Sequence, residues 1–441
     1  MMNLPKLIAL AYTAILILSG NALGAKAEET RSGNSGRTFA DWCRQKDSLN
    51  PETKHTVELL LERARTRECD EADQKLSSLT ELSLIGYSIS DIKPLASLTS
   101  LTLLELTDNQ ISDIKPLESL TKLTQLALND NQISDIKPLA SLTSLTLLDL
   151  DQLPSVDLPA SPTPKFVPKN NLISDIQPLE SLTNLTSLSL GGRQIRDIKP
   201  LASLTNLTEL HLKENQISDI KPLASLTKLK WLMLGNNQIS DIKPLASLTN
   251  LGWLILSNNQ ISNIKPLASL TNLTELSLYS NQISDIQPLA SLTNLTSFNL
   301  SNNQISDIKP LASLTNLQGL SLSNNQISDI KPLASLTSLT SLNLNNNQIG
   351  DIKPLAYLTS LTSLNLSNNQ ISDIKPLASL TSLPALAIWG NPISPKTCPL
   401  SPESSCVWES PRNEVPVRAP TSSPSPLPEQ ESSPLPLPPN F

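Results

Sequence analysis

The sequence predicts an α/β solenoid, capped at both ends, in which each coil adds one strand to a parallel concave sheet and one short helical or 3-10 turn to the convex side. A segment reading NQISDIKPLASLTNL recurs, with small changes, every 22 residues from near position 87 to near position 391. Repetition at such a period is typical of solenoids. The apolar positions of each unit follow neither a helical nor a strand period throughout, so the chain must bend within every unit.

Fourteen units share one pattern, LxxLxLxxNxIxDIxPLxxLxx, over residues 79–395. The xLxLx piece alternates apolar and polar residues, as a half-buried strand does, and the Pro-Leu-Ala-Ser-Leu piece suits one helical turn. A single unit is too small to bury its aliphatic side chains, but stacked neighbours bury them at roughly 1.5–3 kcal/mol each. The units begin at Leu79, Leu101, Leu123, Leu145, Leu185, Leu207, Leu229, Leu251, Leu273, Leu295, Leu317, Leu339, Leu361 and Leu383.

Two polar columns accompany the leucines. An asparagine such as Asn259 or Asn281 follows the strand of most units, and its amide can bond main-chain groups of its own and the adjacent coil. An aspartate such as Asp113, Asp135 or Asp219 recurs beside a lysine in the Ser-Asp-Ile-Lys-Pro step. We interpret these aspartates as acceptors of main-chain hydrogen bonds at the turn; a calcium ladder is the alternative.

These motifs resemble the leucine-rich repeats of the internalin type, the 22-residue bacterial class whose units read NxIxDIxPLxxLxxL. The resemblance covers about residues 79–395. It implies a leucine-rich repeat horseshoe and a role in adhesion or recognition of a protein partner. The immunoglobulin-like domain that follows internalin repeats and a wall anchor are not found, so the resemblance does not extend to host-cell invasion.

The amino-terminal segment predicts export. Residues 1–27 hold Lys6, an apolar run of about twelve residues and small residues at Ala25 and Ala27, which is typical of a signal peptide cleaved before Glu28. We expect a secreted, periplasmic or cell-envelope protein without a membrane span or anchor. Removal of Lys6 and Lys26 shifts the formal net charge from −7 to −9, which disfavours nucleic acid as a partner.

Residues 28–78 and 396–408 are predicted to cap the two ends of the solenoid. In the first segment Asn50 and Pro51 begin an amphipathic helix. Four cysteines fall as two local pairs, and fourteen strands at about 4.8 Å separate the pairs by roughly 60 Å. An exported chain with an even cysteine count suggests disulfides, here Cys43–Cys69 and Cys398–Cys406; a zinc site would need more ligands. Residues 409–441 are rich in proline, and we expect them to be disordered.

The residues between the strand leucines face outward on the concave sheet and vary from repeat to repeat, so they are the candidate binding surface. They divide into an acidic zone in repeats one to four, a zone of large side chains in the middle repeats, and a zone of Ser, Asn and Gly in repeats ten to thirteen. The acidic zone comprises Glu81, Glu105, Asp108, Asp130, Asp149 and Asp151. We predict an exposed apolar patch with a polar rim in the middle zone. The patch comprises Trp231, Met233, Trp253, Ile255 and Tyr279, and the rim includes Glu209, His211, Lys213, Glu214 and Glu275.

An aromatic centre with a polar rim is typical of a protein-interaction hot spot. Trp231 and Trp253 could instead only stack on each other for stability. A glycan is the alternative ligand, since tryptophan rings can stack on sugars while Asn and Ser bond hydroxyl groups, and a cell-envelope structural protein is a further alternative.

Residues 151–170 form a proline-rich insertion after the fourth strand, in which Phe166 and Val167 either overhang the concave face or belong to an indifferent loop. No phosphate-binding loop or nucleophile motif is found. His211 and Glu209 are the one acid/base pairing, without a nucleophile beside them. We therefore expect a protein that is not an enzyme, with no cofactor and no metal. We also expect it to be a monomer.

Overall fold

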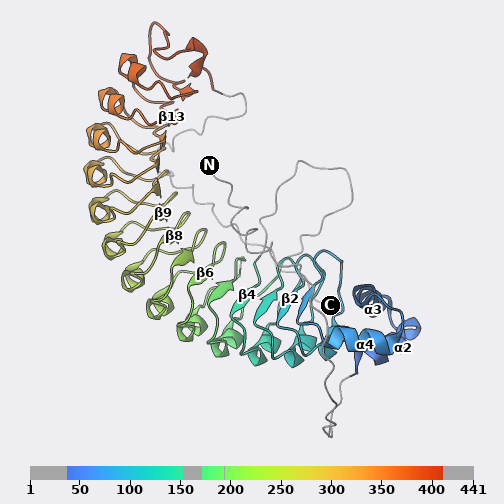
Figure 1. Ribbon diagram of the computed structural model, residues 1–441. Helices are drawn as coiled ribbons and strands as arrows, with labels where there is room; N and C mark the ends of the chain where they lie inside the picture. Colours follow the sequence, from blue (N-terminus) through green and yellow to red (C-terminus); the bar gives the residue numbers. More distant parts are fainter. Residues whose placement is uncertain (1–36, 152–170, 193, 411–441) are drawn as a thin grey trace, which may run out of the picture.

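The computed structural model describes residues 37–151, 171–192 and 194–410, and within them the chain forms one open sheet of fifteen parallel strands in chain order. Figure 1 shows the arc that results, with the strands along its inner side and the turns along its outer side. The predicted α/β solenoid is confirmed. The predicted signal peptide, the insertion beyond Asp151 with Phe166 and Val167, and the proline-rich tail lie outside the described residues.

The strands are three residues long in most coils. They are β1 (Glu81–Ser83), β2 (Leu103–Glu105), β3 (Gln125–Ala127), β4 (Leu147–Asp149), β5 (Ser187–Ser189), β6 (Glu209–His211), β7 (Trp231–Met233), β8 (Trp253–Ile255), β9 (Glu275–Ser277), β10 (Ser297–Asn299), β11 (Gly319–Ser321), β12 (Ser341–Asn343), β13 (Ser363–Asn365), β14 (Leu386–Ala387) and β15 (Cys406–Val407). Each pairs in register with the next, so equivalent positions of successive repeats form straight columns across the sheet.

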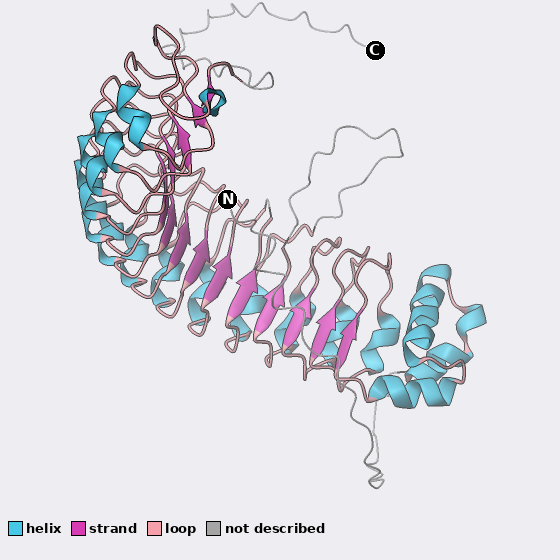
Figure 2. Cartoon of the chain, turned by 45° about the horizontal axis from the view of Figure 1, so that its top comes forward, coloured by secondary structure: helices cyan, strands magenta, loops and turns pink. Residues whose placement is uncertain are grey.

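A 3-10 turn follows each of the first thirteen strands on the convex side, coloured as helix in Figure 2. The turns are η3 (Lys93–Ser97), η4 (Lys115–Ser119), η5 (Lys137–Ser141), η6 (Gln177–Ser181), η7 (Lys199–Ser203), η8 (Lys221–Ser225), η9 (Lys243–Ser247), η10 (Lys265–Ser269), η11 (Gln287–Ser291), η12 (Lys309–Ser313), η13 (Lys331–Ser335), η14 (Lys353–Tyr357) and η15 (Lys375–Ser379). Proline lies in the first turn of each, where its fixed φ is favourable and its missing N–H costs nothing.

The core is a continuous column of leucine and isoleucine between the sheet and the 3-10 turns. In the coil that contains β8, Leu254, Leu256, Ile261 and Leu267 are all fully buried, and the other coils repeat this arrangement. The apolar cluster runs without interruption from Phe39 in the amino-terminal cap to Cys406 in the carboxyl-terminal cap. The coils therefore share one core and stabilise one another.

The asparagine column forms a hydrogen-bonded ladder, as the sequence predicts. The side-chain oxygen of Asn259 accepts from the Ile239 N–H of the preceding coil (3.0 Å), and its amide donates to the carbonyl groups of Leu234 and Leu256 (3.0 Å each). Asn171, directly after the insertion, occupies the same place and bonds Ile133 N–H at 3.0 Å. The ladder therefore continues across the insertion.

The aspartates of the Ser-Asp-Ile-Lys-Pro step have the structural role that the sequence analysis favours. The Asp219 carboxylate accepts the Lys221 N–H at 3.0 Å, and Asp241 accepts the Lys243 N–H at 2.9 Å. Some of the lysines also lie near the aspartate of the same turn: Lys199 Nζ is 3.6 Å from Asp197 Oδ2. The hydrogen bond from the main-chain N–H closes the turn, and the nearby lysine compensates the charge of the aspartate.

Within the described residues three helices precede β1: α2 (Phe39–Arg44), α3 (Pro51–Ala64) and α4 (Cys69–Ser77), with the short turn η2 (Lys46–Ser48) between the first two. The Asn50 side chain accepts the Thr53 N–H at 2.8 Å and so caps α3. Thr56 and Arg63 on α3 then donate to the carbonyl groups of Asp91 and Ser83 in the first coil (2.7 Å each). Helix α3 thus covers the first repeat.

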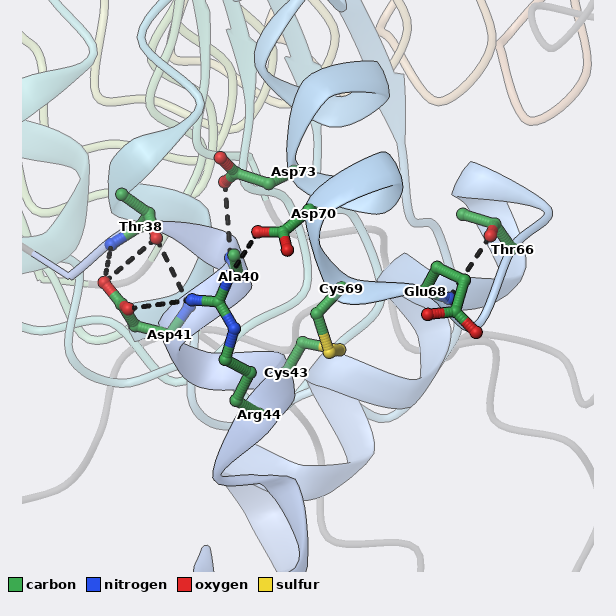
Figure 3. Close-up of a disulfide and its surroundings, with 10 residues drawn as sticks. All are labelled: Thr38, Ala40, Asp41, Cys43, Arg44, Thr66, Glu68, Cys69, Asp70 and Asp73. Atoms are coloured by element: carbon green, nitrogen blue, oxygen red, sulfur yellow. Dashed lines mark hydrogen bonds and ion pairs between the residues drawn. A yellow bond between two sulfur atoms is a disulfide. The ribbon is translucent and has the colours of Figure 1, made fainter.

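The disulfide Cys43–Cys69 joins α2 to α4, with the two Cα atoms 5.5 Å apart (Figure 3). Around it Arg44 pairs with Asp70, and the Ala40 N–H donates to Asp73 at 3.3 Å. The disulfide Cys398–Cys406 closes the other end, and both pairings are those predicted.

The carboxyl-terminal cap adds a strand that the sequence analysis did not predict. After the turn η16 (Glu403–Ser405), β15 pairs with β14, so that Cys406 lies beside Leu386. The repeat pattern ends before this segment, which is why fourteen strands were expected and fifteen are found. The extra strand covers the last repeat's sheet edge, which would otherwise present unpaired main-chain groups. Within the described residues no helix has the length and apolar character needed to cross a membrane.

Candidate functional site

In-register pairing brings four of the five predicted apolar residues of the middle repeats together on the concave face. Trp231 of β7 lies beside Trp253 of β8, and Met233 lies beside Ile255. Tyr279 follows β9 one coil further along. We call these five residues, Trp231, Met233, Trp253, Ile255 and Tyr279, the concave patch.

The two tryptophans contact each other edge to face, with ring centroids 5.2 Å apart and planes 66° apart. Such a pair contributes about 0.5–1.5 kcal/mol beyond the area it buries. All five residues of the concave patch are half-buried rather than exposed. The patch is therefore more covered than predicted, because strands about 4.8 Å apart bring large side chains into contact. The ring contact accounts for part of this burial, and the remaining surface of the patch faces solvent.

Three of the rim residues lie on the strands that flank the patch, and Lys213 and Glu214 follow β6. Glu209 and His211 of β6 are the register partners of Trp231 and Met233, and Glu275 of β9 is the partner of Trp253. Burial beside Trp253 raises the pKa of Glu275 above its usual value. The Ser187 hydroxyl donates to Glu209 at 3.3 Å. The rim is therefore polar and partly desolvated, as at the edge of an interface.

A charged cluster adjoins the rim where the chain leaves β4. Lys213 pairs with Asp151, with Nζ and Oδ2 3.6 Å apart, and both side chains are largely shielded from solvent. The Asp151 carboxylate passes over Gly191, where a Cβ atom would lie 1.9 Å from its Oδ1. A Cβ atom at this position would displace the Asp151 carboxylate from its place beside Lys213.

Asp149 of β4 belongs to the same cluster. Burial raises the pKa of its carboxyl group; a hydrogen bond from the Asn129 side chain, one from the Asp151 N–H and the nearby His211 oppose this rise. The sequence predicts Asp149 and Asp151 in the acidic zone and Lys213 in the rim, but the contact between Asp151 and Lys213 was not predicted. The signal was present, since Asp151, Gly191 and Lys213 occupy equivalent positions of three successive repeats.

Asp149, Ser189 and His211 occupy one column of the sheet. These are the residue types of a hydrolase triad. In a triad the histidine lies between the serine and the carboxylate, whereas here the serine lies between the carboxylate and the imidazole. Ser189 Oγ and His211 Nδ1 are 3.5 Å apart, and Nε2 is buried without a hydrogen-bond partner in the described part of the chain. A triad needs a carboxylate that orients the histidine, so this arrangement does not assemble one.

Further along the sheet the outward positions become small and uncharged. Those of β10–β13 are Ser297, Asn299, Gly319, Ser321, Ser341, Asn343, Ser363 and Asn365. Several polar side chains near these strands form hydrogen bonds from one coil to the next. The hydroxyl groups of Ser301 and Ser321 are 2.7 Å apart, and the Asn346 amide donates to the Asn324 side-chain oxygen at 2.7 Å. No group of three or more potential metal ligands gathers in residues 37–151, 171–192 and 194–410.

Comparison with known proteins agrees with this geometry. The sequence matches the Leucine Rich repeats (2 copies) family over residues 169–203, 205–247, 227–269, 249–291, 271–313, 293–322, 315–357 and 359–398, and the Leucine Rich repeat family over residues 97–114 and 119–136. A comparison with curated proteins found no match.

Among solved structures, an internalin of Listeria monocytogenes, InlF, is 39% identical, with a TM-score of 0.70 over 77% of this chain and 96% of that chain. A leucine-rich repeat protein of Leptospira interrogans is 27% identical, with a TM-score of 0.64 over 79% of this chain and 88% of that one. The fold thus defines a leucine-rich repeat solenoid with a concave parallel sheet. The chain belongs to the leucine-rich repeat family and is of the internalin type, a class whose fold is typical of protein–protein interaction.

Proposed function

We propose that this chain is a secreted, non-enzymatic protein that binds another protein through the concave patch. The observation that carries the proposal is the aromatic pair Trp231–Trp253 in the middle coils of the concave face, with Met233 and Ile255 beside it and polar residues of β6 and β9 on either side. Large aromatic anchors surrounded by a polar rim dominate the free energy of binding at many protein interfaces. The two disulfides and the internalin-type relatives support an extracellular or surface location.

A glycan ligand is the second candidate, because Trp231, Trp253 and Tyr279 offer aromatic surface beside Asn and Ser columns. A sugar ring stacks on the flat face of an aromatic ring. In the concave patch the two tryptophan planes are 66° apart, so the pair does not present one continuous flat surface to a saccharide chain. This geometry favours a protein ligand.

The test compares the protein without residues 1–27 with its Trp231→Ala/Trp253→Ala variant on columns of envelope extract, peptidoglycan and soluble polysaccharide. Tyr357→Ala is the matched control, since Tyr357 is the most exposed large apolar residue described, 66% accessible on the convex side. Circular dichroism establishes that all three proteins fold alike. We expect saturable retention on the extract by the parent protein and the control, and its loss in the double variant.

Treatment of the extract identifies the kind of ligand. Protease digestion should abolish retention if the ligand is a protein, whereas periodate oxidation should abolish it if the ligand is a glycan. Equal retention of the parent protein and the double variant would contradict the proposal and reduce the concave patch to a packing feature.

A further inference from the structure

The concave face carries a one-sided distribution of charge. The outward side chains and strand ends of β1–β4 include the residues of the acidic zone, Glu81, Glu105, Asp108, Asp130, Asp149 and Asp151. The outward positions within these four strands hold no lysine or arginine. Arg63 of α3 reaches the edge of the zone, where it bonds the Ser83 carbonyl and lies 5.7 Å from the centroid of the Tyr87 ring.

The carboxylates of the acidic zone differ from those that build the solenoid. On the convex edge, aspartates such as Asp219 accept a main-chain N–H in the turn and belong to the repeat. The side-chain carboxylates of Glu81 and Glu105 make no hydrogen bond or ion pair within the described residues, and the outward position that Glu105 occupies is not acidic in most repeats. Like charges on neighbouring strands repel one another and do not stabilise the fold. A role outside the fold accounts for them.

The acidic zone and the concave patch belong to one continuous surface. Asp149 of β4 and Trp231 of β7 are three strands apart, about 14 Å at the usual strand spacing. Among the described residues at the outward positions between them, Lys213 is the one cation, and Asp151 already pairs with it. At these described outward positions, a positively charged group approaching the acidic zone therefore meets no unpaired cation between β4 and β7.

We propose that the partner is a protein segment that presents lysine or arginine to the acidic zone and apolar side chains to the concave patch. This inference rests on the proposed function and specifies the chemistry and orientation of the ligand. From Glu105 to Trp253 the segment crosses six strand spacings, roughly 29 Å, which an extended chain spans with about nine residues. The neutral Ser and Asn columns of β10–β13 offer neither charge nor an apolar anchor, so the segment lies over the amino-terminal and middle coils.

The probes are two synthetic peptides of equal length. One carries lysines at one end and leucines with a tyrosine at the other, and the second replaces every lysine with glutamate. Binding of each labelled peptide to the folded protein is followed by fluorescence anisotropy at low and at physiological salt. We expect binding of the lysine peptide that weakens as salt rises, and at least tenfold weaker binding of the glutamate peptide.

Glu81→Gln/Glu105→Gln removes two charges from the acidic zone and should weaken binding of the lysine peptide roughly three- to tenfold. Its control, Glu118→Gln/Glu180→Gln, makes the same change in net charge on the convex turns η4 and η6, where both glutamates are exposed. The control should bind as the parent protein does. The acidic-zone variant should melt at the same or a higher temperature, which excludes misfolding as the cause of weaker binding.

The inference is overturned if neither peptide binds, if both bind equally, if the convex control loses as much affinity as the acidic-zone variant, or if heparin or DNA binds more tightly than the lysine peptide. Retention on envelope extract that depends on Trp231 and Trp253 but not on Glu81 and Glu105 would leave the proposed function intact and reject this inference. Loss of the tryptophan dependence would reject the proposed function itself.

Discussion

Asparagine has a purely structural role at the point where each coil leaves its strand. Asn259 is buried and satisfies one N–H and two carbonyl groups of two adjacent coils. Unpaired polar groups at such a bend would each cost about 1–3 kcal/mol. The amide is suited to this site because it donates and accepts at once.

Replacement of Asn259 by alanine should lower the free energy of unfolding by about 2–4 kcal/mol, because the Ile239 N–H and two carbonyl groups lose their partner. The neighbouring side chain of Gln260 is exposed, and Gln260→Ala is the control. Urea unfolding followed by circular dichroism measures both. Equal urea midpoints for Asn259→Ala and Gln260→Ala would show that water or a main-chain rearrangement replaces the hydrogen bonds of the Asn259 amide.

At the scale of elements, the two caps solve the same problem in different ways. The amino-terminal cap covers the first coil with α3 and holds α2 to α4 through Cys43–Cys69, across a separation of 26 residues. The carboxyl-terminal cap extends the sheet by β15 and closes a separation of 8 residues through Cys398–Cys406. A disulfide that closes the longer loop restricts the unfolded chain more.

Loss of the first disulfide should therefore cost more than loss of the second, about 3.5 against about 2.5 kcal/mol on the loop-entropy estimate. The comparison uses Cys43→Ser/Cys69→Ser and Cys398→Ser/Cys406→Ser in thermal unfolding, with the parent protein under reducing conditions as the reference for the combined effect. A larger loss in the second variant would mean that the fifteenth strand matters more to stability than the helical cap does.

At the scale of the whole molecule, stability comes from contacts between neighbouring coils. The strands pair only with their sequence neighbours, and one apolar column joins all coils. In such an array a local defect acts mainly on the adjacent repeats.

Leu256 in the middle of the array tests this property. It is fully buried, and Leu256→Ala should cost about 2–5 kcal/mol. Hydrogen exchange should rise most in the coils containing β7, β8 and β9 and least in those near the two caps. The exposed Ser262→Ala in the same coil is the control. A uniform rise from β1 to β15 would show that the solenoid opens as one cooperative unit.

The repeat period predicted the solenoid, the buried leucines and the asparagine ladder, because each depends on residue types at fixed spacing. Both disulfides were predictable because the length of the repeat array separates the two cysteine pairs. The repeat period also placed Trp231 beside Trp253, since parallel in-register pairing turns equal repeat positions into neighbours. The half-buried state of this pair was not predictable in the same way. The burial of the pair depends on the side-chain rotamers that the two large rings adopt when their strands are neighbours.

The local sequence pattern was sufficient to predict a residue's contacts wherever its neighbours belong to its own repeat or to the next one. This condition holds for nearly the whole core of this protein. It was insufficient for β15, whose residues belong to no repeat, and for Asp151 and Lys213, whose contact passes over Gly191 from one coil to the next but one. Such contacts depend on the three-dimensional path of the chain and on the space left by a missing side chain. A periodic pattern records which residues recur, whereas the packing of particular side chains determines which of them meet.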